Sequence, residues 1–215
     1  MLVTPKISIP VGFTFYPPAP ELSAWYKQEK ALKKQGVPKP QRPPKPPPNP
    51  LYPTKQHLAL RLLQRFKMAH SDIRVHCIAA DALYGTAPFV DSASALFGGV
   101  QVISQARSNQ HVRLHQRPQP LAAYFATHPE IPQTIRIRGG DERGAMVRSA
   151  RLYLCSHKTK RFIVAIKYDD EETYRYLMAS DLTWRTLDIV QGHSLRWLVE
   201  VFVQDWKGRH WFRFV

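Results

Sequence analysis

The spacing of apolar and polar residues predicts alternating helices and strands in the middle of the chain. Residues 55–69 carry one apolar stripe at helical spacing, directly after Thr54, a residue that favours helix N-caps. Residues 73–80 become continuously apolar, which favours a central strand buried on both faces. A helix over 89–97, ending at two glycines, and a strand over 100–104 follow. This order predicts an α/β sheet.

The first 53 residues follow no such order. Residues 7–16 alternate like a strand, although Pro10 suggests an edge or a bulge, and residues 21–35 predict a short basic helix. Nine prolines lie between residues 38 and 53. Because proline donates no backbone hydrogen bond, we expect 37–53 to be an extended, polyproline-like basic linker. A proline-rich ligand for a signalling module is the alternative for this segment.

Strand-like alternation dominates the second half, and a long helical stretch with Gly192 as its weak point ends the chain. We expect strands over 134–138, 145–155 and 161–168, a further strand within 172–179, and the helix over 183–206. The chain then divides into 1–110, which holds the α/β elements and the linker 37–53, a β-rich insertion over 111–180, and a C-terminal helical part over 181–215.

Charge narrows the class of partner. The 215 residues contain 31 Lys and Arg against 16 Asp and Glu, a net charge of +15. Such an excess favours a polyanion, either nucleic acid or an anionic membrane. No apolar run has the roughly 18–20 residues of a transmembrane helix, and the first residues lack an uninterrupted apolar signal segment. Two cysteines make no disulfide framework, so a reducing cytoplasm fits best.

Two places carry candidate chemistry. At about 100° per residue, His193, Arg196, Glu200 and Lys207 fall on one narrow strip of the C-terminal helix. On the helix alone, an ordinary i, i+4 salt bridge on a solvated face is the favoured explanation of Arg196 and Glu200. Asp81 follows the strand over 73–80, where α/β sheets place ligands, although a turn or cap explains a lone aspartate. The rest of the helix predicts a core face made of Leu195, Leu198, Val199, Phe202, Val203 and Trp206.

Taken together, these features resemble insertion-sequence transposases of the DDE superfamily. Arg196-x3-Glu200-x6-Lys207 is similar to the family's Tyr-x2-Arg-x3-Glu-x6-Lys signature, with His193 at the tyrosine position. The stretch Asp81-Ala-Leu-Tyr-Gly85 resembles the surroundings of the second catalytic aspartate. The resemblance implies a ribonuclease-H-like core, incomplete because its first strand is missing, with a β-rich insertion before the catalytic helix.

The resemblance also implies residue roles. Asp81 and Glu200 would be catalytic and would serve as two of three carboxylate ligands for a pair of Mg²⁺ ions. His193, Arg196 and Lys207 would bind DNA phosphates or orient Glu200. Because metal sharing requires proximity, we expect the two carboxylates to approach within roughly 8 Å. No aspartate precedes Asp72, so we expect a truncated copy that is inactive by itself.

The expected partners are transposon ends and target DNA, with a homodimer on DNA as a possibility, and neither a membrane nor a small-molecule substrate. We expect a bacterial, nucleoid-associated protein in the cytoplasm. A non-catalytic DNA-binding remnant, or a modulator of a full-length transposase, is the alternative. A proline-rich interaction protein that recruits a partner through 37–53 is the third possibility.

Overall fold

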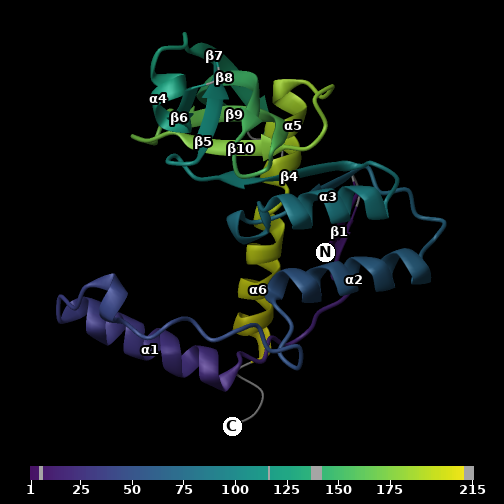
Figure 1. The fold of residues 1–215 in the computed structure, drawn as a ribbon. Helices are drawn as coiled ribbons and strands as arrows, with labels where there is room; N and C mark the ends of the chain where they lie inside the picture. The colour runs from purple at the N-terminus through teal and green to yellow at the C-terminus, as the bar shows by residue number, and fades with distance from the viewer. Residues whose placement is uncertain (5–6, 116, 137–141, 211–215) are drawn as a thin grey trace.

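A mixed sheet with helices on both faces forms the body of the protein (Figure 1). The structure is a computed structural model, and it describes residues 1–4, 7–115, 117–136 and 142–210, with side chains up to residue 205. The strands of this sheet are β3 (Cys77–Ala79), β4 (Gln101–Ala106), β5 (His111–Leu114), β6 (Arg117–Pro120), β7 (Ile131–Arg136), β8 (Glu142–Leu154), β9 (Thr159–Tyr168) and β10 (Arg175–Ala179).

The strand order is β3-β4-β10-β9-β8-β5-β6, and β7 also pairs with β8. Only the β3–β4 pair is parallel; all other pairs are antiparallel. The helices are α1 (Pro20–Lys34), α2 (Lys55–Ala69), α3 (Ala87–Leu96), α4 (Leu121–Ala126), α5 (Thr186–Ser194) and α6 (Trp197–His210), with short 3₁₀ turns η1 (Lys39–Gln41) and η2 (Ala82–Tyr84). The fold is therefore mixed α/β, as the sequence predicts.

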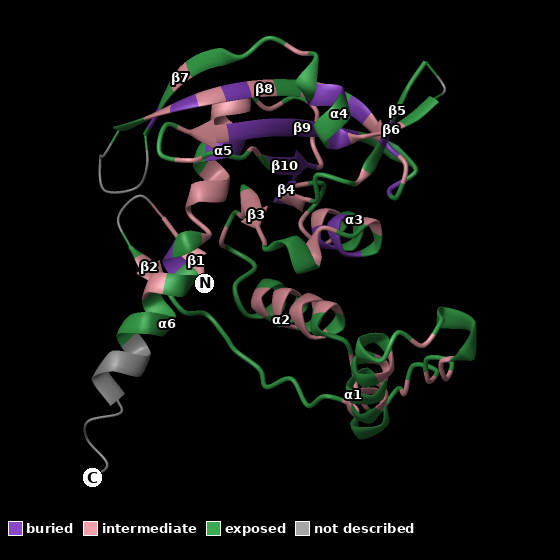
Figure 2. Cartoon of the chain, turned by 90° about the vertical axis from the view of Figure 1, so that its left-hand side faces the viewer, coloured by how far each residue is buried: buried purple, intermediate pink, exposed green. Residues whose placement is uncertain are grey.

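Alternating side chains divide the core into two clusters, one on each face of the sheet. Figure 2 shows that the buried residues concentrate in the strands of the sheet, whereas α1 and α2 have none. On β4, Val102 packs toward α3, and α2 lies against α3. The neighbouring Ile103 packs toward α5 on the opposite face. Helix α5 crosses the strands: Thr186 at its start donates to Ser149 of β8, while Gly192 near its end lies beside Ile103.

The strand predicted over 73–80 is apolar on both faces as expected, but it is only partly buried and it is not central. Strand β3 covers only Cys77–Ala79, and Ile78 and Cys77 pack into the clusters on opposite faces. In the described sheet, however, β3 pairs only with β4 and lies at an edge next to Asp81. The apolar run reflects helices above and below the strand, a pattern that gives no information about strands beside it.

Two further predictions are corrected. The strand expected over 7–16 is limited to β2 (Ser8–Ile9), which pairs with β1 (Leu2–Val3), and residues 10–19 form no strand. The single helix expected over 183–206 is two helices that meet at Leu195 and Arg196. Gly192 does not break the helix; it allows α5 to approach the sheet, since a Cβ there would lie 3.1 Å from Cδ1 of Ile103.

The predicted core face of the C-terminal helix is mostly exposed over its described side chains, and the side chain of Trp206 lies outside them. Leu198 is buried, but Val199, Phe202 and Val203 are 45%, 36% and 36% exposed. Figure 1 shows why, because α6 runs away from the sheet along its length. Helical periodicity located an apolar stripe correctly and gave no information on whether anything covers it.

The proline-rich segment folds back along α1. The indole Nε1 of Trp25 donates to the carbonyl of Pro43 at 2.9 Å, and Arg42 pairs with Glu29 at 2.8 Å. Arg42 also donates from Nε to the carbonyl of Val37. Residues 20–53, which we call the arm, thus form a helix–polyproline hairpin that projects from the body (Figure 1).

Candidate functional site

Asp81 begins a tightly held loop at the end of β3. Its side chain caps η2 by accepting from the backbone N–H of Ala82 at 2.7 Å, while its carbonyl accepts from the hydroxyl of Ser104 at 2.8 Å. Gly85 closes the loop against β4, where a Cβ would lie 2.8 Å from the Gln105 carbonyl oxygen. The cap is the structural role that a lone aspartate predicts, and it leaves the carboxylate exposed.

Two other elements fix the same loop. From α2, Gln56 donates to the carbonyl of Leu83 at 2.6 Å and accepts from the hydroxyl of Thr86 at 3.2 Å. From the turn between β8 and β9, Nε2 of His157 lies 3.1 Å from the carbonyl oxygen of Gly85. The backbone that carries Asp81 is therefore bonded to three separate parts of the fold.

A buried relay supports His157. Nε of Arg161 donates to Nδ1 of His157 at 3.1 Å, so the ring carries its proton on Nε2 and donates to Gly85. Arg161, only 6% exposed, is in turn paired with Asp91 of α3. Burial, and then the positive charge of Arg161, lower the pKa of His157, while its bond to Gly85 and the charge of Asp91 act in the opposite direction. The imidazole is therefore neutral at pH 7.

His193 lies near Asp81 in space. Burial is the main cause that lowers the pKa of His193 to about 4, followed by the charges of Arg196 and Arg175, and the charge of Asp81 opposes them. Arg175 lies on the same face of β10 as Leu177 and Ala179, which is the face that α5 covers. The end of α5, the start of β10 and the loop after β3 thus place one carboxylate and two guanidinium groups around a neutral imidazole.

Arg196 and Glu200 form the i, i+4 salt bridge that the sequence offered as an alternative, with Nη1 and Oε1 2.7 Å apart. Glu200 is 48% exposed. Within the described part of the chain, Nε2 of His193 and Nε of Arg196 are buried without a hydrogen-bond partner. The side chain of Lys207 lies outside the described residues, so its predicted role stays a prediction.

His193 interacts electrostatically with Arg196 and with Asp81, and an ion pair ties Glu200 to Arg196. The direct approach of the Asp81 and Glu200 carboxylates stays a prediction. Among the described residues, no three His, Cys, Asp or Glu side chains gather as a metal site, and Glu200 already has a cationic partner. The Mg²⁺ pair expected at Asp81 and Glu200 likewise stays a prediction.

Sequence reasoning missed Arg175, His157 and Arg161. Arg175 could have been found, because strand alternation places it on the face of β10 that carries Leu177 and Ala179. His157 and Arg161 reach the loop after β3 only through the curl of the β8–β9 hairpin, which no local pattern reports.

Comparisons with protein-family models and with curated proteins give no match for this chain. In the part of the chain that the structure describes, no helix combines the length and apolar character needed to cross a bilayer. The fold and the site together describe a mixed α/β protein with a candidate anion site at one sheet edge.

Proposed function

We propose that this chain binds DNA as part of a DDE-type transposase core, with a ribonuclease-H-like arrangement around Asp81. The observation that carries the proposal is the grouping of the Asp81 loop with His193, Arg196 and Arg175. In this proposal the loop and the helix signature, far apart in the chain, serve one DNA-binding site.

A DNA phosphate can approach the guanidinium of Arg196, because this side chain is 23% exposed. Nε of Arg196 has no hydrogen-bond partner in the described structure, and an unpaired polar group gains from a ligand that satisfies it. Arginine is well suited to phosphate because its guanidinium presents several donors in one plane. The net charge of +15 adds long-range attraction for a polyanion.

In this proposal the chain binds DNA without cutting it by itself. Residues 1–71 contain no aspartate, and Glu200 is paired with Arg196. In this proposal Glu200, held by Arg196, does not share a pair of metal ions with Asp81, as two-metal phosphodiester chemistry would need. A non-catalytic remnant that modulates a full-length transposase is the second candidate, and the same pairing of Glu200 favours it.

Fluorescence anisotropy with a labelled 30-base-pair duplex tests the binding. We expect affinity that falls steeply with salt, with log K declining by roughly 0.9 per neutralised phosphate. Arg196→Gln should weaken binding and reduce this slope. Arg185→Gln is the matched control, because Arg185 is an exposed arginine at the other end of α5, paired with Asp188. Absence of binding at low salt, or equal effects of the two variants, would refute the proposed site.

A plasmid-nicking assay with Mg²⁺ or Mn²⁺ tests the second part of the proposal. We expect no nicking by the purified chain. Metal-dependent nicking that Glu200→Gln abolishes would show that the chain is a complete nuclease and that the pairing of Glu200 is broken in the active state.

A further inference from the structure

A second cationic surface lies on the far part of the sheet. Arg113 of β5, Arg151 and Tyr153 of β8, and Lys160 of β9 make up what we call the basic ladder. Register places Arg113 opposite Tyr153 and Tyr153 opposite Lys160. Arg151 is two residues from Tyr153 on the same strand, so all four side chains share one face.

The cations of the basic ladder have no acidic partner in the described structure, unlike four other arginines of the sheet. Arg113, Arg151 and Lys160 are exposed, and none forms an ion pair within the described part of the chain. Segments 111–114, 149–154 and 159–162 contain no acidic residue. By contrast, Arg143, Arg148, Arg161 and Arg175 each form an ion pair with a carboxylate.

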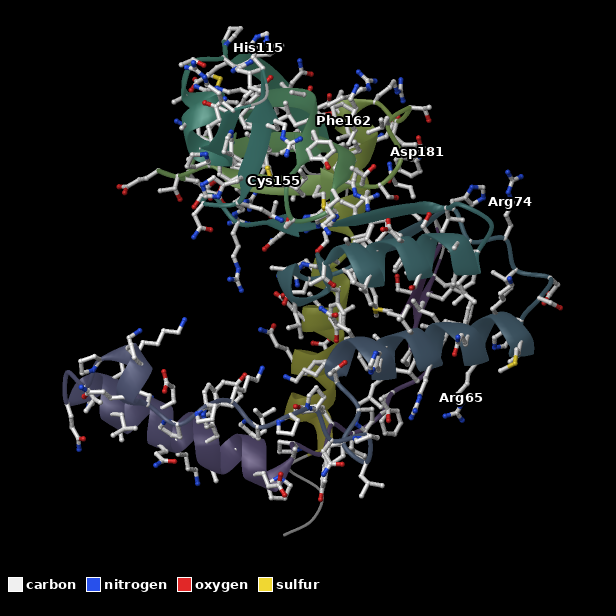
Figure 3. The ribbon with its side chains drawn as sticks, in the orientation of Figure 1. Arg65, Arg74, His115, Cys155, Phe162 and Asp181 are labelled. Carbon is white, nitrogen blue, oxygen red and sulfur yellow. The ribbon has the colours of Figure 1, made fainter. Side chains whose placement is uncertain are left out.

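Aromatic rings hold two of these cations in place. The guanidinium carbon of Arg113 lies over the ring of Tyr153 at 4.9 Å, and that of Arg151 lies over Phe162 at 4.8 Å. Arg151 also donates from Nε to the carbonyl of Leu182 at 2.8 Å. Figure 3 labels Phe162 on this part of the sheet. The two arginines are on neighbouring strands and two residues apart along the strand direction, so their backbone positions are ~8 Å apart.

We propose that the basic ladder binds single-stranded nucleic acid. Unpaired cations attract the phosphate backbone, and guanidinium planes supported by aromatic rings offer stacking surfaces for bases. In a duplex the bases stack on one another, so a duplex would interact with the charges of the ladder and not with its stacking surfaces. A single strand can interact with both, and it is therefore the ligand that fits the ladder best.

This surface is distinct from the site around Asp81. The two sites are built from different elements: the ladder lies on β5, β8 and β9, whereas the other site is formed by the loop after β3, the start of β10 and the junction of α5 and α6. The inference goes beyond the proposed function, because the ladder would bind single strands whether or not the Asp81 region binds a duplex.

Anisotropy with a 20-nucleotide oligothymidine tests the charges. Other basic residues also contribute to binding, so the comparison is between variants. We expect Arg113→Gln, Arg151→Gln and Lys160→Gln each to reduce the salt slope by about 0.7. The matched control is Arg143→Gln, on the same strand and face as Arg151 but paired with Asp170; it should change the slope little. Slopes equal to that of the control would overturn phosphate binding by the ladder.

Charge-preserving variants test the stacking. Arg113→Lys and Arg151→Lys keep the cation and remove the planar group. We expect an unchanged salt slope and a roughly fivefold or greater loss of affinity for oligothymidine, with little loss for a 20-base-pair duplex or for inorganic polyphosphate. Equal losses on the duplex would overturn the preference for single strands, and no loss on oligothymidine would overturn the stacking. Thermal unfolding of each variant, expected to match the parent, separates binding effects from misfolding.

The same binding assays distinguish failure of the ladder proposal from failure of the proposed function. Variants of the ladder should change binding of the single strand, whereas Arg196→Gln should change binding of the duplex. If only Arg196→Gln has an effect, the ladder proposal is wrong and the proposed function stands; the reverse pattern leaves the ladder and refutes the site around Asp81.

Discussion

Replacing Glu200 by glutamine should strengthen the binding of duplex DNA. In the structure Glu200 occupies one end of the Arg196 guanidinium at 2.7 Å. A phosphate that reaches Arg196 must compete with this carboxylate and also meets its negative charge. The neutral amide of Glu200→Gln removes both obstacles and leaves the backbone of α6 unchanged.

The expected magnitude is small and measurable. An i, i+4 pair on a helix contributes about 0.3–0.5 kcal/mol, and Glu200 is half exposed, so the lower part of this range applies. Removing the competition should tighten the dissociation constant by about twofold. If Arg196 then neutralises one further phosphate, the salt slope should rise by up to ~0.9. The free energy of unfolding should fall by the same few tenths of a kcal/mol.

The assay is anisotropy of a duplex at several salt concentrations without divalent metal. Asp188→Asn is the control, because it releases Arg185 from a similar pair, with Oδ1 2.8 Å from Nη2, at the other end of α5. Affinity that does not change, or that weakens, in Glu200→Gln would refute phosphate binding by Arg196. An equal gain in the control would show that net charge alone explains the result.

Two predictions concern stability. Folding lowers the pKa of His193 from its usual 6.5 to about 4, so the folded state favours the neutral ring. The free energy of unfolding is therefore highest above pH 6.5. It should decrease by up to roughly 3 kcal/mol as the pH falls toward 4. Urea unfolding across this pH range should show that the free energy of unfolding decreases less in His193→Gln than in the parent. Equal decreases in the two proteins would contradict the argument from burial. Gly85→Ala should lower the free energy of unfolding by about 1–3 kcal/mol, because the added Cβ would lie 2.8 Å from the Gln105 carbonyl oxygen. Gly12→Ala is the control and should change it little, because its Cβ would meet only Cδ2 of Leu62 at 3.5 Å.

Local patterns predicted the elements whose causes are local. Helix α2 begins and ends where its apolar stripe and Thr54 indicate, and Thr54 accepts from the backbone N–H of His57 at 3.2 Å. Helix α3 ends before Gly98 and Gly99, both at positive φ, as the glycine pair suggests. These features depend on spacing and backbone conformation within one segment, so one sequence is enough to find them.

Features that depend on distant segments were missed. The edge position of β3 depends on which strands lie beside it, and the exposure of Phe202 depends on the direction of α6. At the candidate site, the salt bridge of Arg196 follows from helical spacing, whereas the position of Arg175 near His193 depends on the register of β10. Hydrophobic pattern specifies a face of an element and does not specify its neighbours.

The hairpin of the arm has a consequence for how the chain is assembled. Tyr16, before the arm, and Lys55, after it, meet at its base, where the ammonium of Lys55 lies 5.1 Å from the centre of the Tyr16 ring. The polypeptide therefore leaves the body and returns to nearly the same place, so the arm is topologically an insertion. An excursion of this kind can be shortened or lengthened at little entropic cost, because loop closure depends only weakly on length. Joining residue 19 to residue 54 through a short glycine-rich bridge should leave a folded body, and the arm is then a part that can be exchanged independently of the sheet.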